Sequence, residues 1–400
     1  MRYAYRFNWY RTVRVYLDHN AGAPIRPQVR DAIADYLSRA THGNPSSVHR
    51  SGQEARRELE QARERVASLI GAHTRTIVFT SGGTESNNLA IFGAIGAAPK
   101  RHRIVTTAIE HSSLLTPLID LESRGYEIIR VKPDREGLID PAAVAEQIND
   151  ETSVVSIGLA NAEVGSIQKI GPIAESAANA GALVHLDAAQ AAGRIPLDVS
   201  KLRCDLMTLS AHKLGGIEGS GALFLRRGAR IVPTILGGPQ ESGLRAGTPN
   251  LIGAIAFGVA AEVSAANLDE ESERLRHLSQ QLLDRLSAAI PGLAVNGPSQ
   301  DRLPNTLNLT FPGVLGETLL IAFDLEGIEV SMGSACAAGA VEPSHVLLAM
   351  GRSAAAARSS LRLSLGWNTT AEEIAFAGEI IPRVWQRIAE AEPIPTTEAA

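Results

Sequence analysis

The sequence has little cysteine, with only Cys204 and Cys336 among 400 residues. Two cysteines cannot build a disulfide framework, and this scarcity suits a reducing compartment, so we expect the chain in the cytoplasm. An excess of positive charge is also missing, since the net charge is -5 and the pI is near 6.1. This balance argues against a nucleic-acid or anionic-membrane partner. No apolar run reaches membrane-spanning length, so we expect no membrane segment.

Residues 1–14 are cationic and aromatic but lack the continuous apolar core and small-residue cleavage site of a signal peptide. We interpret them as an N-terminal extension that packs on the surface or on a partner subunit. At 400 residues the chain exceeds the usual size of one hydrophobic core, so two domains are expected. The predicted division is a large domain over residues 31–294, a small α+β domain from residues 15–30 and 295–390, and a disordered tail over residues 391–400.

Short β-prone runs alternate with helical patterns between residues 76 and 225. Such alternation predicts an α/β fold with a mostly parallel sheet and helices on both faces. An amphipathic helix is predicted over residues 52–70, because apolar side chains recur on one face and charged ones on the other. Residues 250–290 read as a long helical stretch that leads into the small domain.

The stretch between His185 and Lys213 carries the strongest chemical signal. Lys213 follows an apolar run and lies among small and polar residues, which is typical of a Schiff-base lysine at the end of a buried strand. Asp187 ends a second apolar strand. Pyridoxal phosphate (PLP) withdraws electrons only while its ring nitrogen stays protonated, and a buried carboxylate keeps it so. Lys213 and Asp187 are therefore candidates to hold opposite sides of one PLP ring.

Each of these residues also has a simpler interpretation. A lysine after a strand is usually a solvated loop residue, and an aspartate there is more often a helix N-cap. Two further segments favour the functional interpretation. Residues 76–88 read as strand, glycine turn and helix, so backbone N–H groups at the helix start form a phosphate cradle. His111 follows another strand, where an imidazole can stack on a cofactor ring and shuttle protons. Polar groups at strand carboxyl ends are where open α/β sheets gather their ligands.

Ten short motifs of the sequence together resemble those of a known family. The motifs YLDHNA, GNPSSVH, GQEAR, FTSGGTESNNLAI, IEHSS, HLDAAQ, LSAHK, GLRAGT, SMGSACAAG and SSLRLSLG occur in the order found in cysteine desulfurases. These are PLP enzymes of the class V aminotransferase family, and the resemblance is to the iron–sulfur-assembly and nitrogenase-maturation branch. It covers about residues 15–385. It implies the PLP-dependent transferase type I fold, with a mostly parallel seven-stranded sheet in the large, PLP-binding domain.

The resemblance also implies roles for residues around the cofactor ring. Lys213 is implied to form the Schiff base, and Asp187 to pair with the pyridine nitrogen. Gln190 is implied to hydrogen-bond the ring hydroxyl, and His111 to stack on the ring. The implied phosphate ligands are Gly83, Thr84, Ser210 and His212, with Thr248 reaching the phosphate of the neighbouring subunit. A homodimer follows from that last assignment.

Cys336 is the residue on which the implied reaction depends. It lies in SMGSACAAGA, a run of small residues with little side chain to pack, which predicts a mobile loop. An exposed thiol in such a loop is a liability unless its reactivity is used. The resemblance implies that this thiol attacks the sulfur of L-cysteine, giving L-alanine and a persulfide for a sulfur-acceptor protein. Cys204, near the start of a buried strand, is predicted to be a small core residue.

Arg362 is implied to clamp the substrate carboxylate in a two-point contact, and Asn161 to bind the substrate. No metal site is expected. The chain departs from the family pattern at several positions, among them Ala162 for an asparagine, Glu218 for a lysine and Trp367 for an arginine.

Two alternatives to desulfuration therefore stay open. The first is a PLP-dependent lyase or aminotransferase that acts on another β-substituted amino acid, such as selenocysteine or cystine. The second is a PLP-binding scaffold of low activity that serves as a binding partner.

Overall fold

A seven-stranded sheet lies at the centre of the larger part of the molecule. In this computed structural model, residues 14–39, 42–333 and 342–391 are described. The strand order is β2-β8-β7-β6-β5-β3-β4. Their bounds are β2 Ile77–Thr80, β3 Arg103–Thr107, β4 Glu127–Val131, β5 Thr152–Gly158, β6 Leu183–Asp187, β7 Leu206–Ser210 and β8 Gly221–Leu225.

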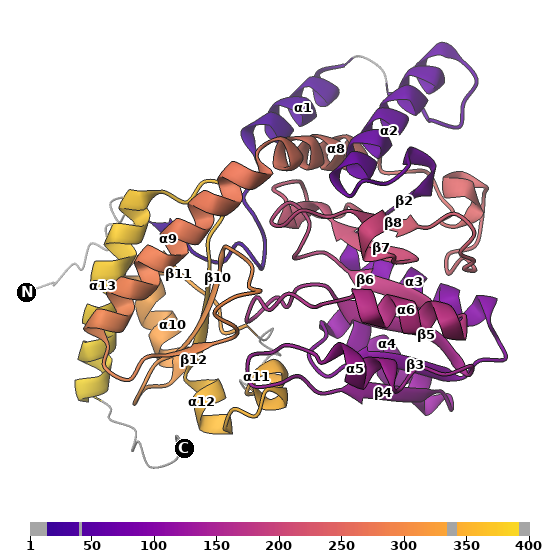
Figure 1. Cartoon of the computed structure of the whole chain (residues 1–400). Coiled ribbons are helices and arrows are strands. Elements are labelled where there is room, and N and C mark those ends of the chain that lie inside the picture. Colours follow the sequence, from indigo (N-terminus) through magenta and orange to yellow (C-terminus); the bar gives the residue numbers. More distant parts are fainter. Residues whose placement is uncertain (1–13, 40–41, 334–341, 392–400) are drawn as a thin grey trace, which may run out of the picture.

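Strands β3 to β7 pair in parallel, and β8 runs antiparallel to both of its neighbours, β2 and β7. The residues of β5 and β7 are almost all buried, as in parallel strands that are covered on both faces. Helices lie on both sides of the sheet, with α6 (Gly171–Ala180) on one face and α3 (Gly83–Ala97) and α4 (Ser112–Ser123) on the other (Figure 1). The predicted α/β fold class is confirmed.

The helix predicted over residues 52–70 is α2, which spans Arg50–Leu69. It packs against α8 (Leu251–Ala266), while α1 (Pro27–Ser38) also contacts α8. The two helix backbones approach closely at Gly258, where an added Cβ would lie 2.8 Å from the Cα of Ala62. A larger side chain at Gly258 would therefore force α2 and α8 apart.

The helical stretch predicted over residues 250–290 consists of two helices, α8 and α9 (Leu268–Ala289). They meet at Asn267 with a bend of 74°. The Asn267 amide donates a 2.7 Å hydrogen bond to the Val263 carbonyl, which ends the first helix. No single helix among the described residues has the length and apolar composition to cross a bilayer, although this bent pair passes that test jointly.

The rest of the chain forms a second group of strands and helices beside the large sheet (Figure 1). A three-stranded antiparallel sheet has the order β12-β10-β9, and β1 pairs with β11. Helices α9, α10 and α13 cover this sheet, and a separate hydrophobic core fills the space between. The bounds are β1 Val15–Tyr16, β9 Ala294–Asn296, β10 Thr306–Thr310, β11 Ile328–Glu329, β12 Ser360–Ser364, α10 Gly316–Leu325 and α13 Ala371–Ala391.

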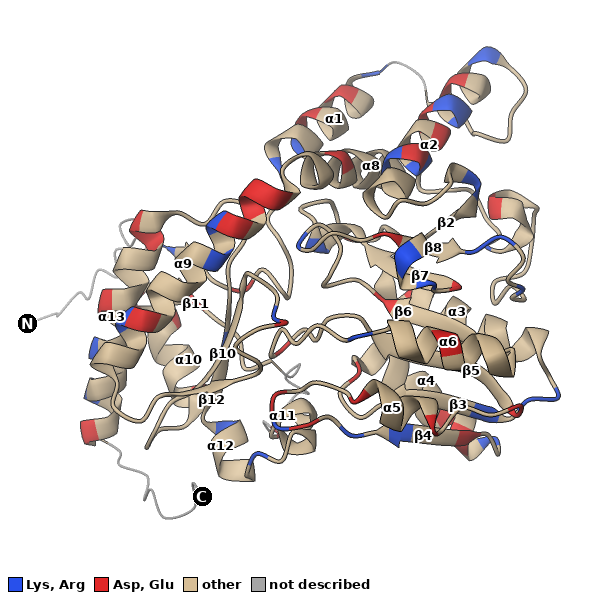
Figure 2. Ribbon diagram, in the orientation of Figure 1, with Lys and Arg blue, Asp and Glu red and all other residues tan. Residues whose placement is uncertain are grey.

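Short helices complete the described chain. They are α5 Pro141–Ala145, α7 Val199–Leu202, α11 His345–Ala349 and α12 Ala354–Arg358, with 3-10 turns η1 Thr74–Thr76, η2 Ala211–Lys213 and η3 Gln240–Gly243. Figure 2 shows residues of both charge signs along α2, α9 and α13. The predicted domain boundaries stay predictions, and so does the disordered tail, since residues 392–400 lie outside the described chain.

Candidate active site

The carboxyl ends of several strands of the large sheet carry the predicted site residues. Asp187 is the last residue of β6, and Lys213 lies in η2, directly after β7. His111 lies between β3 and α4, and Gly83 begins α3 after β2. Because parallel strands end at the same edge of a sheet, the sequence order of these motifs becomes one cluster in space.

The Lys213 amine is held by backbone carbonyls of a distant segment. Its Nζ donates to the carbonyl of Asn20 at 2.6 Å and to that of Ala21 at 2.8 Å. The side-chain amide of Gln190 donates to the same Asn20 carbonyl at 3.0 Å. Lys213 and Gln190 therefore share an anchor on the segment that follows β1.

Several groups around Lys213 shift its pKa. Burial is the main cause, and together with the nearby cations Arg194 and Arg362 it lowers the pKa from 10.5 to about 8. The carboxylates of Asp18 and Asp187 oppose this change. A neutral amine is the nucleophile that condenses with an aldehyde, so the lowered pKa suits Lys213 for covalent attachment of a carbonyl compound.

This pKa gives a first prediction. Uptake of PLP by the apoenzyme should speed up as the pH rises and reach half its limiting rate near pH 8, because only the neutral Lys213 amine attacks. The measurement is the rate of covalent attachment, followed by borohydride trapping between pH 6 and pH 10. A midpoint near the ordinary lysine value of about 10.4 would contradict the assignment.

Asp187 and His111 are joined through two polar side chains. The Nδ2 of Asn87, on α3, donates to Asp187 Oδ2 and to Ser113 Oγ, both at 2.8 Å. The Ser113 hydroxyl lies 2.8 Å from His111 Nδ1, and the Ser113 backbone N–H donates to the same nitrogen at 3.1 Å. Since Nδ1 accepts these bonds, the neutral imidazole carries its proton on Nε2.

The charge state of His111 follows from its surroundings. Burial lowers its pKa, and so do the positive charges of Lys213 and His345, whereas Asp187 raises it. The ring is therefore neutral near pH 7. A neutral imidazole with a free Nε2–H can lie flat against an aromatic ring and still exchange a proton with a bound ligand.

The candidate phosphate ligands surround the start of α3. An added Cβ at Gly83 would lie 3.7 Å from the Ser210 Cβ, so these two residues are neighbours. The Ser210 hydroxyl lies 3.0 Å from His212 Nδ1. Burial lowers the pKa of His212 to about 4. Thr84 is the second residue of α3, whose first N–H groups have no partner within the helix. A hydroxyl, an imidazole and a helix N-terminus together suit a phosphate.

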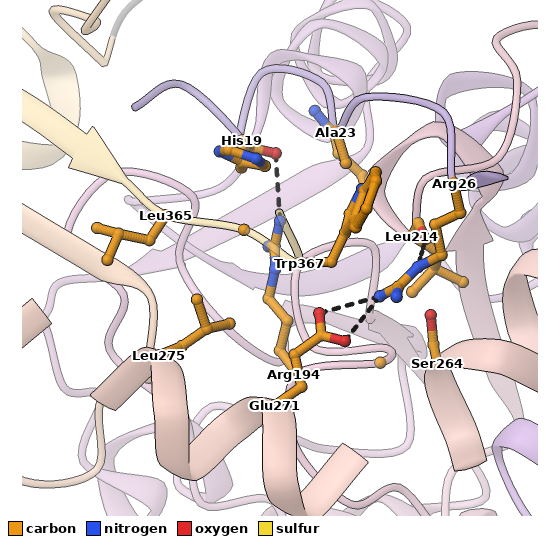
Figure 3. Close-up of a pocket in the computed structure, with 13 residues that line it drawn as sticks. His19, Ala23, Arg26, Arg194, Leu214, Ser264, Glu271, Leu275, Leu365 and Trp367 are labelled. Carbon is orange, nitrogen blue, oxygen red and sulfur yellow. Dashed lines mark hydrogen bonds and ion pairs between the residues drawn. The ribbon is translucent and has the colours of Figure 1, made fainter. Parts of the chain in front are cut away.

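Lys213 is one of the residues that line a small cavity, which Figure 3 shows. Arg194 extends across it and donates to the His19 carbonyl at 3.3 Å, and its guanidinium also binds the side chain of Gln190. On the other side Arg26 and Glu271 form a partly buried ion pair at 2.9 Å. The cavity volume is about 20 Å³, enough for a single water molecule. A cavity of this size is too small to hold the cofactor.

Arg362 lies on β12 and is buried, and one of its N–H groups has no acceptor among the described residues. Its Nη2 pairs with Asp18 Oδ1 at 2.6 Å, and its Nη1 donates to the Ala162 carbonyl at 3.2 Å. Within the described chain nothing accepts from its buried Nε–H. A buried donor without a partner is unfavourable unless a ligand completes it. The Nε–H is therefore an unused donor beside the ion pair with Asp18.

Asn161 is occupied mainly by local backbone contacts. Its Oδ1 accepts from the N–H groups of Glu163 at 2.8 Å and Val164 at 3.0 Å, and its Nδ2 donates to the Ile109 carbonyl at 3.0 Å. One amide hydrogen remains for a ligand. The substrate role of Asn161 stays a prediction.

The remaining sequence-predicted residues lie elsewhere. Cys336, with its predicted mobile loop, falls in residues 334–341, outside the described residues. Cys204 is fully buried, and burial raises the pKa of its thiol to about 12, so its prediction as a core residue is confirmed. Thr248 lies on the exposed surface of this chain.

Sequence reasoning missed several residues that hold the site together. Asn87 and Ser113 connect Asp187 to His111, yet both lie in helices whose sequence suggests only polar caps. Asp18 and Asn20 belong to the YLDHNA motif, but the sequence predicted no role for either of them. Their contacts to Arg362 and Lys213 join residues that are 344 and 193 positions apart, which no local pattern reveals.

Comparisons with known proteins agree with this geometry. Residues 15–376 match the family described as aminotransferase class-V. The chain belongs to this family and to its cysteine desulfurases. It is 41% identical to the cysteine desulfurase IscS of Dictyoglomus turgidum over 380 residues, which cover 95% of this chain and 96% of that protein. A cysteine desulfurase IscS of Methanosarcina thermophila is 39% identical, over 96% of this chain and 95% of that one.

Solved structures give the same result. A NifS-like protein superposes with a TM-score of 0.88 at 34% identity, covering 94% of this chain and all of the other. The structure of SspA in complex with cysteine has a TM-score of 0.78 at 33% identity, covering 88% of this chain and 98% of that one.

Cysteine desulfurases of this family use PLP, and the residues present fit that cofactor. Three groups lie at one edge of the sheet: the Lys213 amine with a pKa of about 8, the Asp187 carboxylate held by an amide, and the hydroxyl and imidazole that suit a phosphate. When bound, PLP withdraws electrons from the α-carbon of an amino acid. Among the residues that the structure describes, no cluster of His, Cys, Asp or Glu is arranged to hold a metal ion.

Proposed function

We propose that this chain removes the sulfur of L-cysteine and passes it to Cys336. The C–S bond of the substrate breaks and an S–S bond to Cys336 forms, while the former thiol carbon takes up a proton. The products are L-alanine and a Cys336 persulfide, and the reaction needs no external oxidant or reductant. The observation that carries the proposal is the convergence of Lys213, Asp187 and Arg362 in a chain that belongs to the cysteine desulfurases.

Each described residue has a definable task. Lys213 would hold the cofactor, and its amine, with a pKa lowered to about 8, would move protons beside it. Asp187 would pair with the ring nitrogen, and the Asn87 amide holds its Oδ2 at 2.8 Å. His111 lies on the same network, where it can cover the ring and exchange a proton through Nε2.

Arg362 is proposed to bind the carboxylate of L-cysteine. Its guanidinium is fixed by Asp18 and by the Ala162 carbonyl, so its orientation is set before the substrate arrives. A planar guanidinium binds a carboxylate through two parallel N–H groups, which an ammonium cannot reproduce.

A second prediction follows from this geometry. Arg362→Lys should raise the KM for L-cysteine by about tenfold or more and change kcat much less, because the lost contact serves ground state and transition state alike. The matched control is Arg358→Lys, an exposed arginine at the end of α12. Steady-state alanine production measures both variants. Equal KM values in Arg362→Lys and the parent would remove Arg362 from the substrate site.

We also propose a two-fold homodimer in which Thr248 of each chain contacts the phosphate site of the other. The loop that carries Thr248 exposes the apolar side chains of Val232, Ile235 and Leu236, with Leu236 82% exposed. A second copy would cover them. A fully active monomer in sedimentation of the holoenzyme would refute this arrangement. The proposed recipient of the persulfide is a sulfur-acceptor protein, and the proposed compartment is the cytoplasm.

Product analysis with purified protein tests the function as a whole. Incubation with L-cysteine should yield L-alanine and protein-bound sulfur in equal amounts. A keto acid or another fragment from a different β-substituted amino acid would favour the lyase or aminotransferase alternative. No product despite bound PLP would favour the scaffold alternative.

A further inference from the structure

Two short stems flank the segment that carries Cys336. Residues 331–333 lead into the segment and residues 342–344 lead out of it. Both stems contact the side chain of one residue, Glu163, which lies in the turn after β5 and is 5% exposed. Neither the sequence motifs nor the roles assigned above use this carboxylate.

The first stem is attached to β12 and lies against Glu163. Ser331 exchanges two backbone hydrogen bonds with Arg362, at 3.1 Å and 2.6 Å. Gly333 has a φ of 87°, and a Cβ added there would lie 2.8 Å from Glu163 Oε2. A glycine is therefore required both by the backbone conformation and by the contact. The backbone of this stem changes direction at Gly333, where it packs against the Glu163 carboxylate.

The second stem is hydrogen-bonded to the same carboxylate oxygen. The Ser344 hydroxyl donates to Glu163 Oε2 at 2.5 Å and also accepts the Leu347 N–H at 3.2 Å, which caps α11. The next residue, His345, donates from Nε2 to the Glu110 carbonyl at 3.0 Å, one residue before His111. The start of α11 is thus fixed both to Glu163 and to the backbone that places His111.

The environment of Glu163 raises the pKa of its carboxyl group. Burial raises its pKa, while the Ser344 hydroxyl and the charges of His345 and Arg362 act in the opposite direction. Its own backbone is fixed by Asn161, whose Oδ1 accepts the Glu163 N–H at 2.8 Å. The carboxylate is therefore held at one position relative to the substrate-binding arginine.

We propose that Glu163 is a positioning residue that joins the two stems of the Cys336 segment beside Arg362. Through Ser344 and Gly333 it fixes the two points from which the intervening residues extend. The expected effect of Glu163 on kcat rests on the proposed function of Cys336. Its contacts with the two stems do not depend on that function. A reacting atom displaced by about 1 Å can lose about 100-fold in rate, so loss of this junction acts on kcat.

The test compares Glu163→Ala with Glu163→Gln in the holoenzyme. Glu163→Ala should speed amide hydrogen exchange at least about tenfold in both stem peptides, with no change in the peptide of β6. Its kcat should fall about 10- to 100-fold, while PLP content and the KM for L-cysteine stay within about twofold. Glu163→Gln keeps an acceptor oxygen for Ser344 and should restore most of the protection and the rate.

Serine variants keep the proposal testable if Glu163→Ala fails to fold. Ser344→Ala should speed amide exchange in the stem formed by residues 342–344, because it removes the hydrogen bond that holds this stem to Glu163. Ser353→Ala is the matched control, because Ser353 caps α12 in the same way at 3.2 Å without touching Glu163. Parent-like exchange in residues 342–344 of Ser344→Ala, or in both stems of a folded Glu163→Ala, would overturn the proposal. Full activity of Cys336→Ala would instead overturn the proposed function and leave the exchange result intact.

Discussion

Changing Cys336 to alanine should lower alanine production from L-cysteine by at least about 1,000-fold. The substrate sulfur then has no protein thiol to attack it, so the C–S bond stays intact. PLP content and L-cysteine binding should remain at the parent level, because Lys213, Asp187 and Arg362 supply both without this residue. Steady-state alanine assays and the absorbance of bound cofactor measure the two effects separately.

The matched control is Cys204→Ala. Cys204 is the other cysteine of the chain, fully buried in the larger core, and burial raises its pKa to about 12. A thiol with this pKa carries almost no thiolate near pH 7 and cannot act as a nucleophile. Cys204→Ala should therefore keep the parent rate while losing about 1 kcal/mol of stability. If Cys336→Ala makes alanine and sulfide at the parent rate, the lyase alternative, which needs no enzyme thiol, becomes the better account.

Changing Lys213 to alanine should reduce turnover by at least about 1,000-fold, and for a different reason. This variant loses both the attachment point of the cofactor and the amine that moves protons. It should still hold PLP noncovalently, because Asp187 and the group formed by Gly83, Ser210 and His212 remain. Added PLP should not restore the rate.

Borohydride reduction followed by peptide mapping checks the same assignment. The parent should carry the reduced cofactor on Lys213, and Lys213→Ala should carry none. Lys169→Ala serves as control, because Lys169 is exposed and forms a surface ion pair with Asp301 at 3.3 Å. A reduced adduct on any other lysine of the parent would contradict the arrangement of the site.

The sequence was sufficient for the parts of the site that follow strand ends. Asp187 ends one strand, and Lys213 and His111 follow the ends of two others, so the topology of a mostly parallel sheet brings them to one edge. The helix at residues 52–70 was predictable from its apolar face. Apolar runs and apolar helix faces are formed by residues close together in the sequence, so they can be recognised from the sequence alone.

Contacts between distant segments were beyond such reasoning. The hydrogen bond from Ser344 to Glu163 joins residues 181 positions apart, and nothing near either residue indicates the other. The bend between α8 and α9 was missed for a related reason. Asparagine occurs within helices as well as at their ends, so the sequence did not show that Asn267 ends α8. The packing of α8 on α2 and of α9 on α13 then sets the two helix directions.

Two of the departures from the family pattern have a structural explanation. Ala162 replaces an asparagine, yet its backbone carbonyl still accepts from Asn20 at 3.0 Å and from Arg362 at 3.2 Å, contacts that do not depend on the side chain. Trp367 replaces an arginine and donates from Nε1 to the Pro24 carbonyl at 2.8 Å, while Arg26 stacks on its ring at 5.6 Å. Glu218 is exposed, and nothing in the structure explains it.

The central claim is that sulfur leaves L-cysteine for Cys336, and the mass of the Cys336 peptide tests it most directly. The holoenzyme is mixed with L-cysteine for one turnover, its thiols are alkylated, and the peptides are weighed. We predict that the Cys336 peptide becomes heavier by one sulfur atom, in step with L-alanine release, while the Cys204 peptide is unchanged. Alanine released in full with no added sulfur on Cys336 would contradict the account.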